Sequence, residues 1–285
     1  MSRPQWTEDV LEALDGAPPG VLLWDADFTL WATDIGFLAW RRSVDWGRLR
    51  EAATEPISEE LIAIGAMPRF EPHADGRQLM EYARHGGVSD EALISVMVTC
   101  FAGWTPAELE DLGAEIARHE LGRECHEGIH ELLAELARRG HRSIVITASS
   151  ESLVRGAVRE LALPVEDIIG IQARLDDEGR IGNRVAPPLS FHDGKVTAWR
   201  ARAATLNPED RPILGAFSDS ASDRAMLELA SRLRGAVHPS ARLLRTVEEQ
   251  GEPWRLLRPA ATVGGRALSG DPEDLFEMLG GPLEC

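Results

Sequence analysis

Cysteine is scarce in this chain, and long apolar segments are absent. The 285 residues include three scattered cysteines, Cys100, Cys125 and Cys285, with no C-x-x-C pair. Such a set indicates neither a disulfide framework nor a zinc site. No segment approaches the roughly 20 apolar residues that a membrane helix requires, and residues 1–6 lack the apolar core of a signal peptide. We therefore expect a soluble, cytoplasmic protein with an ordinary apolar core.

Basic residues are also few. The chain has 47 acidic and 30 basic residues, which gives a formal net charge of −17. Nucleic acids and anionic membranes are bound by basic faces, so we expect neither as a partner. A small phosphorylated molecule is not excluded, because a local cation can outweigh the field of the whole protein.

Among the basic residues, lysine is nearly missing. Arginine accounts for 29 of the 30, and Lys195 is the only lysine. A lysine that persists in such a chain indicates a position where a compact ammonium group cannot be replaced by a planar guanidinium. The alternative is survival by chance. Lys195 is therefore a candidate functional residue.

The order of apolar segments predicts an α/β fold with a doubly wound parallel sheet. The first strand is short and is followed by a long stretch with helical spacing and no convincing strand, after which strands and helices alternate. We expect a core of residues 1–33 and 124–258, an inserted all-helical cap of residues 34–123, and a loose tail of residues 259–285. The predicted strands are 21–24, 143–146, 168–171, 213–217 and 235–237; the predicted helices of the core are 7–15, 128–139, 151–161, 196–206, 223–230 and 240–250, with a hairpin near 174–181.

Two aspartates, Asp25 and Asp27, follow the apolar run 21–24 directly. In open α/β sheets, chemistry is found beyond the carboxyl ends of the strands. Two carboxylates gathered there repel each other, and a bound divalent cation is the commonest reason to keep them. The alternative is an ordinary Asx turn after a strand.

Three further polar groups follow later predicted strands or open the next helix. Thr147-Ala148-Ser149-Ser150 follows strand 143–146, Lys195 stands where helix 196–206 begins, and a segment with Asp219 and Asp223 follows strand 213–217. In a parallel sheet these groups meet at one edge. Carboxylates, a hydroxyl and an ammonium group together are what phosphoryl transfer requires.

The ordered set resembles the haloacid dehalogenase superfamily, specifically its phosphatases with a helical cap near the phosphoserine-phosphatase-like branch. The resemblance covers most of the chain, including the helical insert, the hairpin around 176–181 and the pattern 237–243 that leads to Trp254. Two residues depart from the pattern: Phe28 stands where many relatives have Gly or Ser, and Ser218 where Gly is usual. Neither removes a reacting group, but both put the substrate in doubt.

The resemblance implies catalytic roles for four residues. Asp25 would attack phosphorus and form an aspartyl-phosphate, and Asp27 would protonate the leaving alkoxide and then activate water. Thr147 would donate a hydrogen bond to a phosphoryl oxygen, unless it is only a helix cap. Lys195 would neutralise charge on the nucleophile and the phosphate.

The resemblance also implies Mg²⁺ as the cofactor. Its ligands would be Asp25, the backbone carbonyl of Asp27, and Asp219, with Asp223 as a further ligand or a supporting residue. Oxygen donors of this kind suit Mg²⁺. For Asp223, the alternative is a carboxylate that stabilises the first turn of its helix.

Individual residues also argue against some of the reactions known in the superfamily. Asp27 argues against dehalogenation, which needs no acid for the leaving group. The predicted cap has no lysine for the Schiff base of phosphonate cleavage. We expect a Mg²⁺-dependent phosphomonoesterase acting on a small phosphate ester; the alternatives are a phosphotransferase or phosphomutase and, less favoured because binding does not need Asp27, a non-catalytic protein of this fold.

Residues that would select the substrate are harder to identify. Asp34 matches an acidic residue that contacts the substrate ammonium in phosphoserine phosphatases, but it could equally be a first-turn helix acid. Ser149 and Ser150 are further candidates for substrate binding. Three tryptophans near the start of the cap are interpreted as cap core rather than as an aromatic box for a cation: Trp31, Trp40 and Trp46. The sequence predicts neither the substrate nor the oligomeric state.

Overall fold

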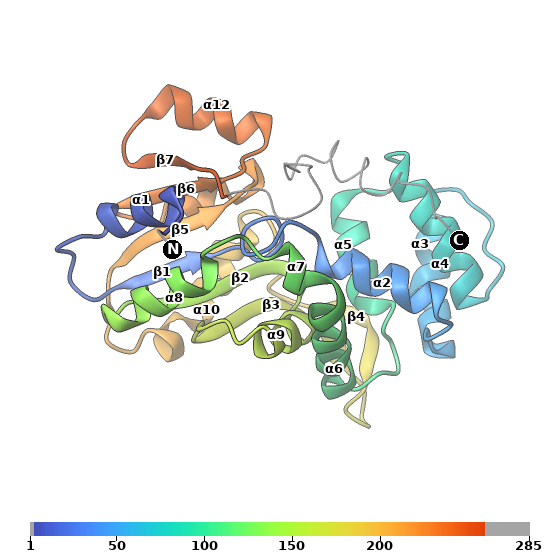
Figure 1. Cartoon of the computed structure of the whole chain (residues 1–285). Coiled ribbons are helices and arrows are strands. Elements are labelled where there is room, and N and C mark those ends of the chain that lie inside the picture. The colour runs from blue at the N-terminus through green and yellow to red at the C-terminus, as the bar shows by residue number, and fades with distance from the viewer. Residues whose placement is uncertain (1–2, 260–285) are drawn as a thin grey trace.

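A seven-stranded sheet forms the centre of the molecule (Figure 1). The computed structural model describes residues 3–259 of the chain. All neighbouring strands are parallel except β3 and β4, which form an antiparallel hairpin. The α/β class with a mostly parallel sheet is thus confirmed. In their order across the sheet, the strands are β4 (Ile181–Ala186), β3 (Asp167–Leu175), β2 (Arg142–Ser150), β1 (Val21–Trp24), β5 (Ile213–Ser218), β6 (Leu233–Val237) and β7 (Trp254–Leu257).

Strand β1 lies in the middle of the sheet because it is apolar on both faces. Side chains alternate along a strand, and those of Leu22 and Trp24 enter one apolar cluster while Val21 and Leu23 enter another. Helices cover both faces of the sheet. One face is covered by α1 (Gln5–Ala13), α8 (Ile129–Arg138) and α9 (Glu151–Glu160). The other is covered by α10 (Gly194–Leu206), α11 (Arg224–Leu227) and α12 (Ala241–Gln250).

Between β1 and α8 the structure is helical and contains no strand. Helices α2 to α5 lie beyond one end of the sheet (Figure 1). Several begin after a residue that caps them: Asp34 before α2, Glu71 before α4, Ser89 before α5 and Thr105 before α6. The helices are α2 (Ile35–Asp45), α3 (Thr54–Ala63), α4 (Pro72–Arg84), α5 (Asp90–Thr99), α6 (Pro106–Ile116) and α7 (Gly122–Glu124), with a 3-10 turn at Glu51–Ala53 and a π-helical turn at Ala117–Leu121.

Helix α6 packs on core helix α9 through two glycines. A Cβ added at Gly113 would run into the carbonyl of Leu153, and one at Gly156 would run into the carbonyl of Glu110. The two helix backbones therefore touch, and only glycine fits at this crossing. The last long helix of the insert is thus held directly against the core.

Gly113→Ala is expected to destabilise the protein by about 3 kcal/mol, because overpacking against a rigid backbone forces the helices apart. Urea-induced unfolding measures the effect. Gly122→Ala is the matched control, since a Cβ there meets its nearest neighbour at 3.4 Å and the residue is helical. An equal loss in both variants would contradict the packing argument.

The structure differs from the predicted elements at three places. Strand β2 continues through Ser150, although its pairing with β3 shifts between Ile146 and Ser150. The predicted helix 223–230 is a 3-10 turn at Ala221–Asp223 followed by the single turn α11. Strand β7 was not predicted, because Arg255 interrupts its apolar run. The predicted tail lies outside the described residues except for Pro259.

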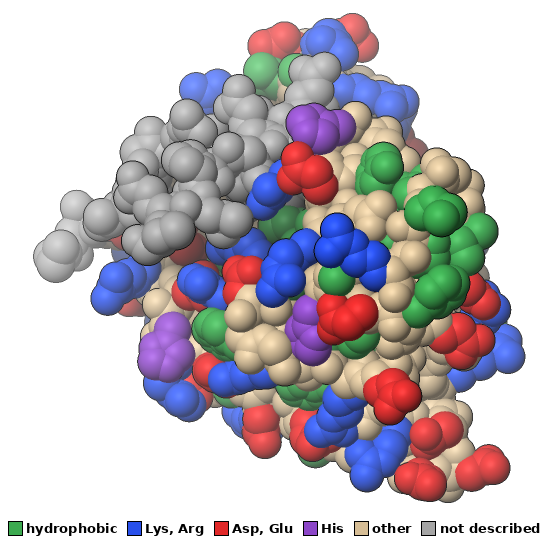
Figure 2. All heavy atoms as spheres, turned by 90° about the vertical axis from the view of Figure 1, so that its right-hand side faces the viewer, with side chains coloured by type: hydrophobic (Ala, Val, Ile, Leu, Met, Phe, Trp, Pro, Cys, Tyr) green, Lys and Arg blue, Asp and Glu red, His purple; other side chains and the backbone are tan. Residues whose placement is uncertain are grey.

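The face of the helical insert carries both signs of charge. In Figure 2, arginine and acidic side chains are interspersed over this face, and apolar side chains gather along one flank. Ile62, Met67 and Phe70 of α3 and the loop after it are among the exposed large apolar side chains. In the part of the chain that the structure describes, no helix is both long and apolar enough to cross a membrane.

Candidate active site

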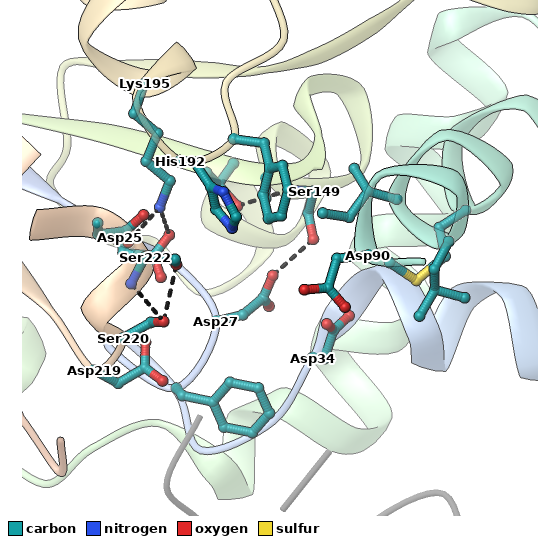
Figure 3. A pocket seen from close by; sticks show the side chains of 18 of the residues that line it. Asp25, Asp27, Asp34, Asp90, Ser149, His192, Lys195, Asp219, Ser220 and Ser222 are labelled. Atoms are coloured by element: carbon teal, nitrogen blue, oxygen red, sulfur yellow. Dashed lines mark hydrogen bonds and ion pairs between the residues drawn. The ribbon is translucent and has the colours of Figure 1, made fainter. Parts of the chain in front are cut away.

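Asp25, Lys195 and Asp223 form a buried ion cluster at the carboxyl end of β1, and Figure 3 shows Asp25 beside Lys195. The backbone N–H of Asp25 donates to the carbonyl of Phe217 in β5, which places the carboxylate directly after the strand. Lys195 Nζ, from the first turn of α10, lies 2.7 Å from Asp25 Oδ1 and 2.6 Å from Asp223 Oδ2. Ser218 Oγ also donates to Asp223 Oδ2, at 2.7 Å. The only lysine of the chain thus joins two of the predicted site residues.

The charges of this cluster do not balance. Burial disfavours the charged ammonium of Lys195, but Asp223 and Asp25 outweigh burial and raise its pKa. Burial raises the pKa of Asp25 to about 7 despite the attraction of Lys195. Asp219, 2 % exposed, also has a raised pKa, through burial and the charges of Asp25 and Asp223. One ammonium group therefore faces three carboxylates.

The carboxyl group of Asp27 is not part of this cluster and accepts hydrogen bonds from three other donors. Its Oδ1 accepts from Trp31 Nε1 at 2.8 Å and from the backbone N–H of Ile35 at 2.9 Å, and its Oδ2 accepts from Ser149 Oγ at 2.6 Å. Burial, and next the charge of Asp34, raises the pKa of Asp27 to about 7. A carboxyl group oriented in this way, with a pKa near neutrality, can both give and take a proton.

Trp31 has a role that the sequence did not reveal. Its ring is fully buried, as expected for a core residue, but its indole N–H is one of the three donors to Asp27. The four-residue spacing between Asp27 and Trp31 is the one signal of this contact. Within the same loop, Phe28 has a φ of 58°, a left-handed conformation that favours glycine. Its ring lines the cavity described below.

The three hydroxyl residues near the end of β2 have different surroundings. Thr147 Oγ1 accepts from the backbone N–H of Ser149 at 3.0 Å, which leaves its own proton free to donate to a ligand. Thr147 caps no helix. Ser149 Oγ donates its proton to Asp27 and also lines the cavity. Ser150 is at the start of α9, is buried and does not line the cavity, so the structure does not bring this predicted residue to the site.

Asp34 caps a helix and also faces the cavity. Its Oδ1 accepts from the backbone N–H of Phe37 at 2.7 Å and so caps α2. The same side chain lines the cavity next to Asp27 (Figure 3). Helix capping therefore fixes the position of a carboxylate that faces the cavity.

The donor set fits a divalent cation, and it favours one of the two roles expected for Asp223. Asp219 Oδ2 is buried and has no hydrogen-bond partner, and it lies in the cavity with Asp25. A cation of charge two would offset the excess of carboxylates. Asp223 Oδ2 is already occupied by Lys195 and Ser218, so Asp223 fits better as the residue that holds Lys195 than as a ligand. Residues 3–259 contain no ready-made cage of three or more ligand side chains, and Mg²⁺ usually binds through one or two carboxylates and water.

These residues open into one cavity of about 190 Å³. The ion cluster and Asp27 lie at one end, together with Ser220, Ser222 and His192, which the sequence analysis did not single out. The other end is formed largely by α4, α5 and the turn between them, and it includes Asp90. Helix α5 is apolar on most of its surface, which is the signal that it is covered on several sides. Trp40 and Trp46 do not line the cavity; Trp40 is fully buried, and Trp46 is 43 % exposed.

Solved structures with a similar fold include proteins without a known function. A protein of unknown function from Bordetella pertussis Tohama I has a TM-score of 0.65 and 21% identity, over 85% of this chain and 99% of that chain. A functionally unknown protein from Anaerococcus prevotii DSM 20548 has a TM-score of 0.62 and 15% identity, over 90% and 92%. A HAD family hydrolase from Salmonella enterica subsp. enterica serovar Typhi has a TM-score of 0.50 and 14% identity, over 86% and 75%. No curated protein matches the sequence.

The sequence matches the family model of the haloacid dehalogenase-like hydrolases over residues 22–228. This span begins in β1, just before Asp25 and Asp27, and ends just after α11, beyond Asp219 and Asp223. It therefore contains the whole ion cluster, the separately held carboxyl group and the helical insert between them. The chain belongs to the haloacid dehalogenase-like hydrolases.

Proposed function

We propose that this chain is a Mg²⁺-dependent phosphomonoesterase that forms an aspartyl-phosphate at Asp25. The observation that carries the proposal is the pairing of Asp25 with the buried Lys195, beside a second carboxyl group, Asp27, that is held by its own donors. Nucleophile and proton donor are thereby kept in different environments within one cavity. This separation is what a two-step transfer through a covalent intermediate requires.

In the first step, Asp25 attacks phosphorus. Lys195 holds Oδ1 of Asp25, so Oδ2 forms the new bond to phosphorus while the ester bond to the alcohol breaks. Asp27 gives its proton to the leaving alkoxide. Thr147 donates its hydroxyl proton to a phosphoryl oxygen. Asp25 and Asp219 would hold Mg²⁺, which supplies positive charge against the phosphoryl oxygens when it is bound.

In the second step, Asp27 acts as the base. It takes a proton from a water molecule whose oxygen attacks phosphorus, and the bond between phosphorus and Asp25 breaks. Inorganic phosphate leaves, and both carboxyl groups return to their starting states. Asp27 can serve in both directions because its pKa, about 7, is near the working pH.

The proposal is tested by phosphate release from purified protein. We expect p-nitrophenyl phosphate and some members of a panel of small phosphate esters to be hydrolysed with Mg²⁺ present, and activity to disappear with EDTA and return with added Mg²⁺. No release from any ester in the presence of Mg²⁺ would refute the proposal. Transfer of the phosphoryl group to an added alcohol in preference to water would favour a phosphotransferase instead.

Lys195→Arg is expected to lower kcat/KM by about 100-fold, in the range of losing one electrostatic group at a reacting centre. Arginine keeps the charge, but its planar fork cannot occupy the point that lies 2.7 Å from Asp25 and 2.6 Å from Asp223. Steady-state kinetics with p-nitrophenyl phosphate measure the loss. Arg200→Lys, on the exposed side of the same helix, is the control and is expected to change nothing. Full activity of Lys195→Arg would mean that charge alone is needed there.

A further inference from the structure

The cavity has two ends of different chemistry. The reacting groups occupy one end. At the other end the wall is apolar and is made by side chains of the insert and of two loops: Ala83, Val88, Leu93, Ile94, Met97, Phe28 and Phe191. A wall of this kind packs against the non-phosphate part of a ligand and favours a short hydrocarbon body.

Two carboxylates interrupt this apolar wall. The side chain of Asp34 caps α2, and Asp90 is the first residue of α5, after its cap Ser89. Figure 3 shows both side chains at the same end of the cavity, past Asp27 as seen from Lys195. Each has a structural use at its helix, but the two helices place both carboxylates in one apolar space.

Among residues 3–259, no lysine or arginine lies at this end of the cavity. Of the described residues that line the cavity, Lys195 is the one lysine or arginine, and it is bound to Asp25 and Asp223. None of the many arginines in residues 3–259 lines the cavity. A ligand amine would therefore find two acceptors here, whereas a ligand carboxylate would find repulsion and no partner.

We propose that the site accepts phosphate monoesters of short amino alcohols that carry a cationic amine and no carboxylate. This inference rests on the phosphatase activity proposed above. The phosphate would lie at Lys195, the carbon chain against Met97 and its neighbours, and the amine between Asp34 and Asp90. Phosphoserine has the same amine but adds a carboxylate, which the apolar wall and the two aspartates disfavour.

The test compares three esters with Mg²⁺ present: 2-aminoethyl phosphate, n-propyl phosphate, which lacks the charge, and phosphoserine, which adds a carboxylate. We expect kcat/KM for 2-aminoethyl phosphate to exceed the other two by about 10- to 100-fold, the usual worth of a charge-assisted hydrogen bond in a partly buried site. Equal or better hydrolysis of phosphoserine would overturn the inference.

Two substitutions test the carboxylates. Asp34→Asn keeps the helix cap but loses the charge, and it should lower the ratio of kcat/KM for 2-aminoethyl phosphate to that for n-propyl phosphate by at least about tenfold. Asp90 is exposed, so Asp90→Asn should lower the same ratio by only about fivefold. Glu91→Gln is the matched control, because Glu91 is in the same first turn of α5, is exposed and does not line the cavity. An unchanged ratio in Asp34→Asn, or an equal change in Glu91→Gln and Asp90→Asn, would overturn the inference.

A reciprocal variant adds the missing cation. Met97→Lys places an ammonium group on the apolar wall and should raise the ratio of kcat/KM for phosphoserine to that for 2-aminoethyl phosphate by about tenfold. No rise in this ratio would count against the inference. Hydrolysis of p-nitrophenyl phosphate without any preference for the amine would overturn this inference and leave the phosphatase proposal standing. Failure to hydrolyse any ester would overturn both.

Discussion

Asp25→Asn is expected to lower turnover by at least about 10⁴-fold, the scale of loss when a covalent nucleophile is removed. The amide has nearly the same shape as the carboxyl group and can still accept from Lys195, but its oxygen is too weak a nucleophile to attack phosphorus. The loss should be in kcat, with the fold unchanged. Phosphate release from p-nitrophenyl phosphate by the purified variant measures it.

The same substitution should not cost stability. The pKa of Asp25 is raised from 3.8 to about 7, which means that the folded protein disfavours the ionised carboxylate at neutral pH compared with the unfolded chain. A neutral amide removes this penalty, and Lys195 keeps Asp223 as a partner. Thermal unfolding in EDTA should therefore give a Tm equal to or above that of the wild type. Persistent turnover would refute the nucleophile, and a large fall in Tm would show that Asp25 is mainly structural.

Asp27→Asn is expected to affect esters according to their leaving groups. Alkyl phosphates release a strongly basic alkoxide, and the loss of a general acid should slow their hydrolysis by about 10³-fold. p-Nitrophenolate leaves without a proton, so the first step with p-nitrophenyl phosphate should be nearly unaffected. The second step needs Asp27 as a base with either ester. Rapid mixing should thus show a burst of p-nitrophenol close to the enzyme concentration, followed by slow turnover.

The hydrogen bonds around Asp27 indicate that Asp27→Asn removes the acid without disturbing the loop. The amide oxygen can still accept from Trp31 Nε1 and the N–H of Ile35, so the loop should keep its shape. Ser149→Ala is a useful comparison, because it removes one donor to Asp27 and leaves the carboxyl group. It should slow both kinds of ester by about tenfold and give no burst. Equal losses in the rate of the first step with alkyl and p-nitrophenyl esters would exclude Asp27 as the acid.

The local sequence pattern was enough to bring most of the candidate catalytic residues to one cavity. The apolar run before Asp25 is buried on both faces, and so it had to form a central strand with its carboxyl end at the site. Thr147 and Asp219 also lie at the cavity end of strands, and the sole lysine is beside Asp25. Strand ends and helix starts can be read from neighbouring residues, because they depend on periodicity and capping within a few positions.

Contacts between distant segments could not be read in this way. Asp223 was expected as a metal ligand or a supporting residue, and its contacts with Lys195 and Ser218 favour the supporting role. Ser150 was expected at the site, but it is buried and does not line the cavity. Strand β7 forms by pairing with β6 of the sheet.

The sequence by itself determined the class of the fold and the chemistry that can occur in it, because strand burial and residue type are local properties. The tertiary structure alone decided which of these residues contact one another and which side chains line the rest of the cavity. Asp25 and Lys195 are 170 positions apart, and Asp27 and Ser149 are 122 apart. Asp34 and Asp90 meet in one apolar space only because α2 and α5 both start at the cavity. Such meetings depend on the packing of whole helices against the sheet, which no short stretch of residues encodes.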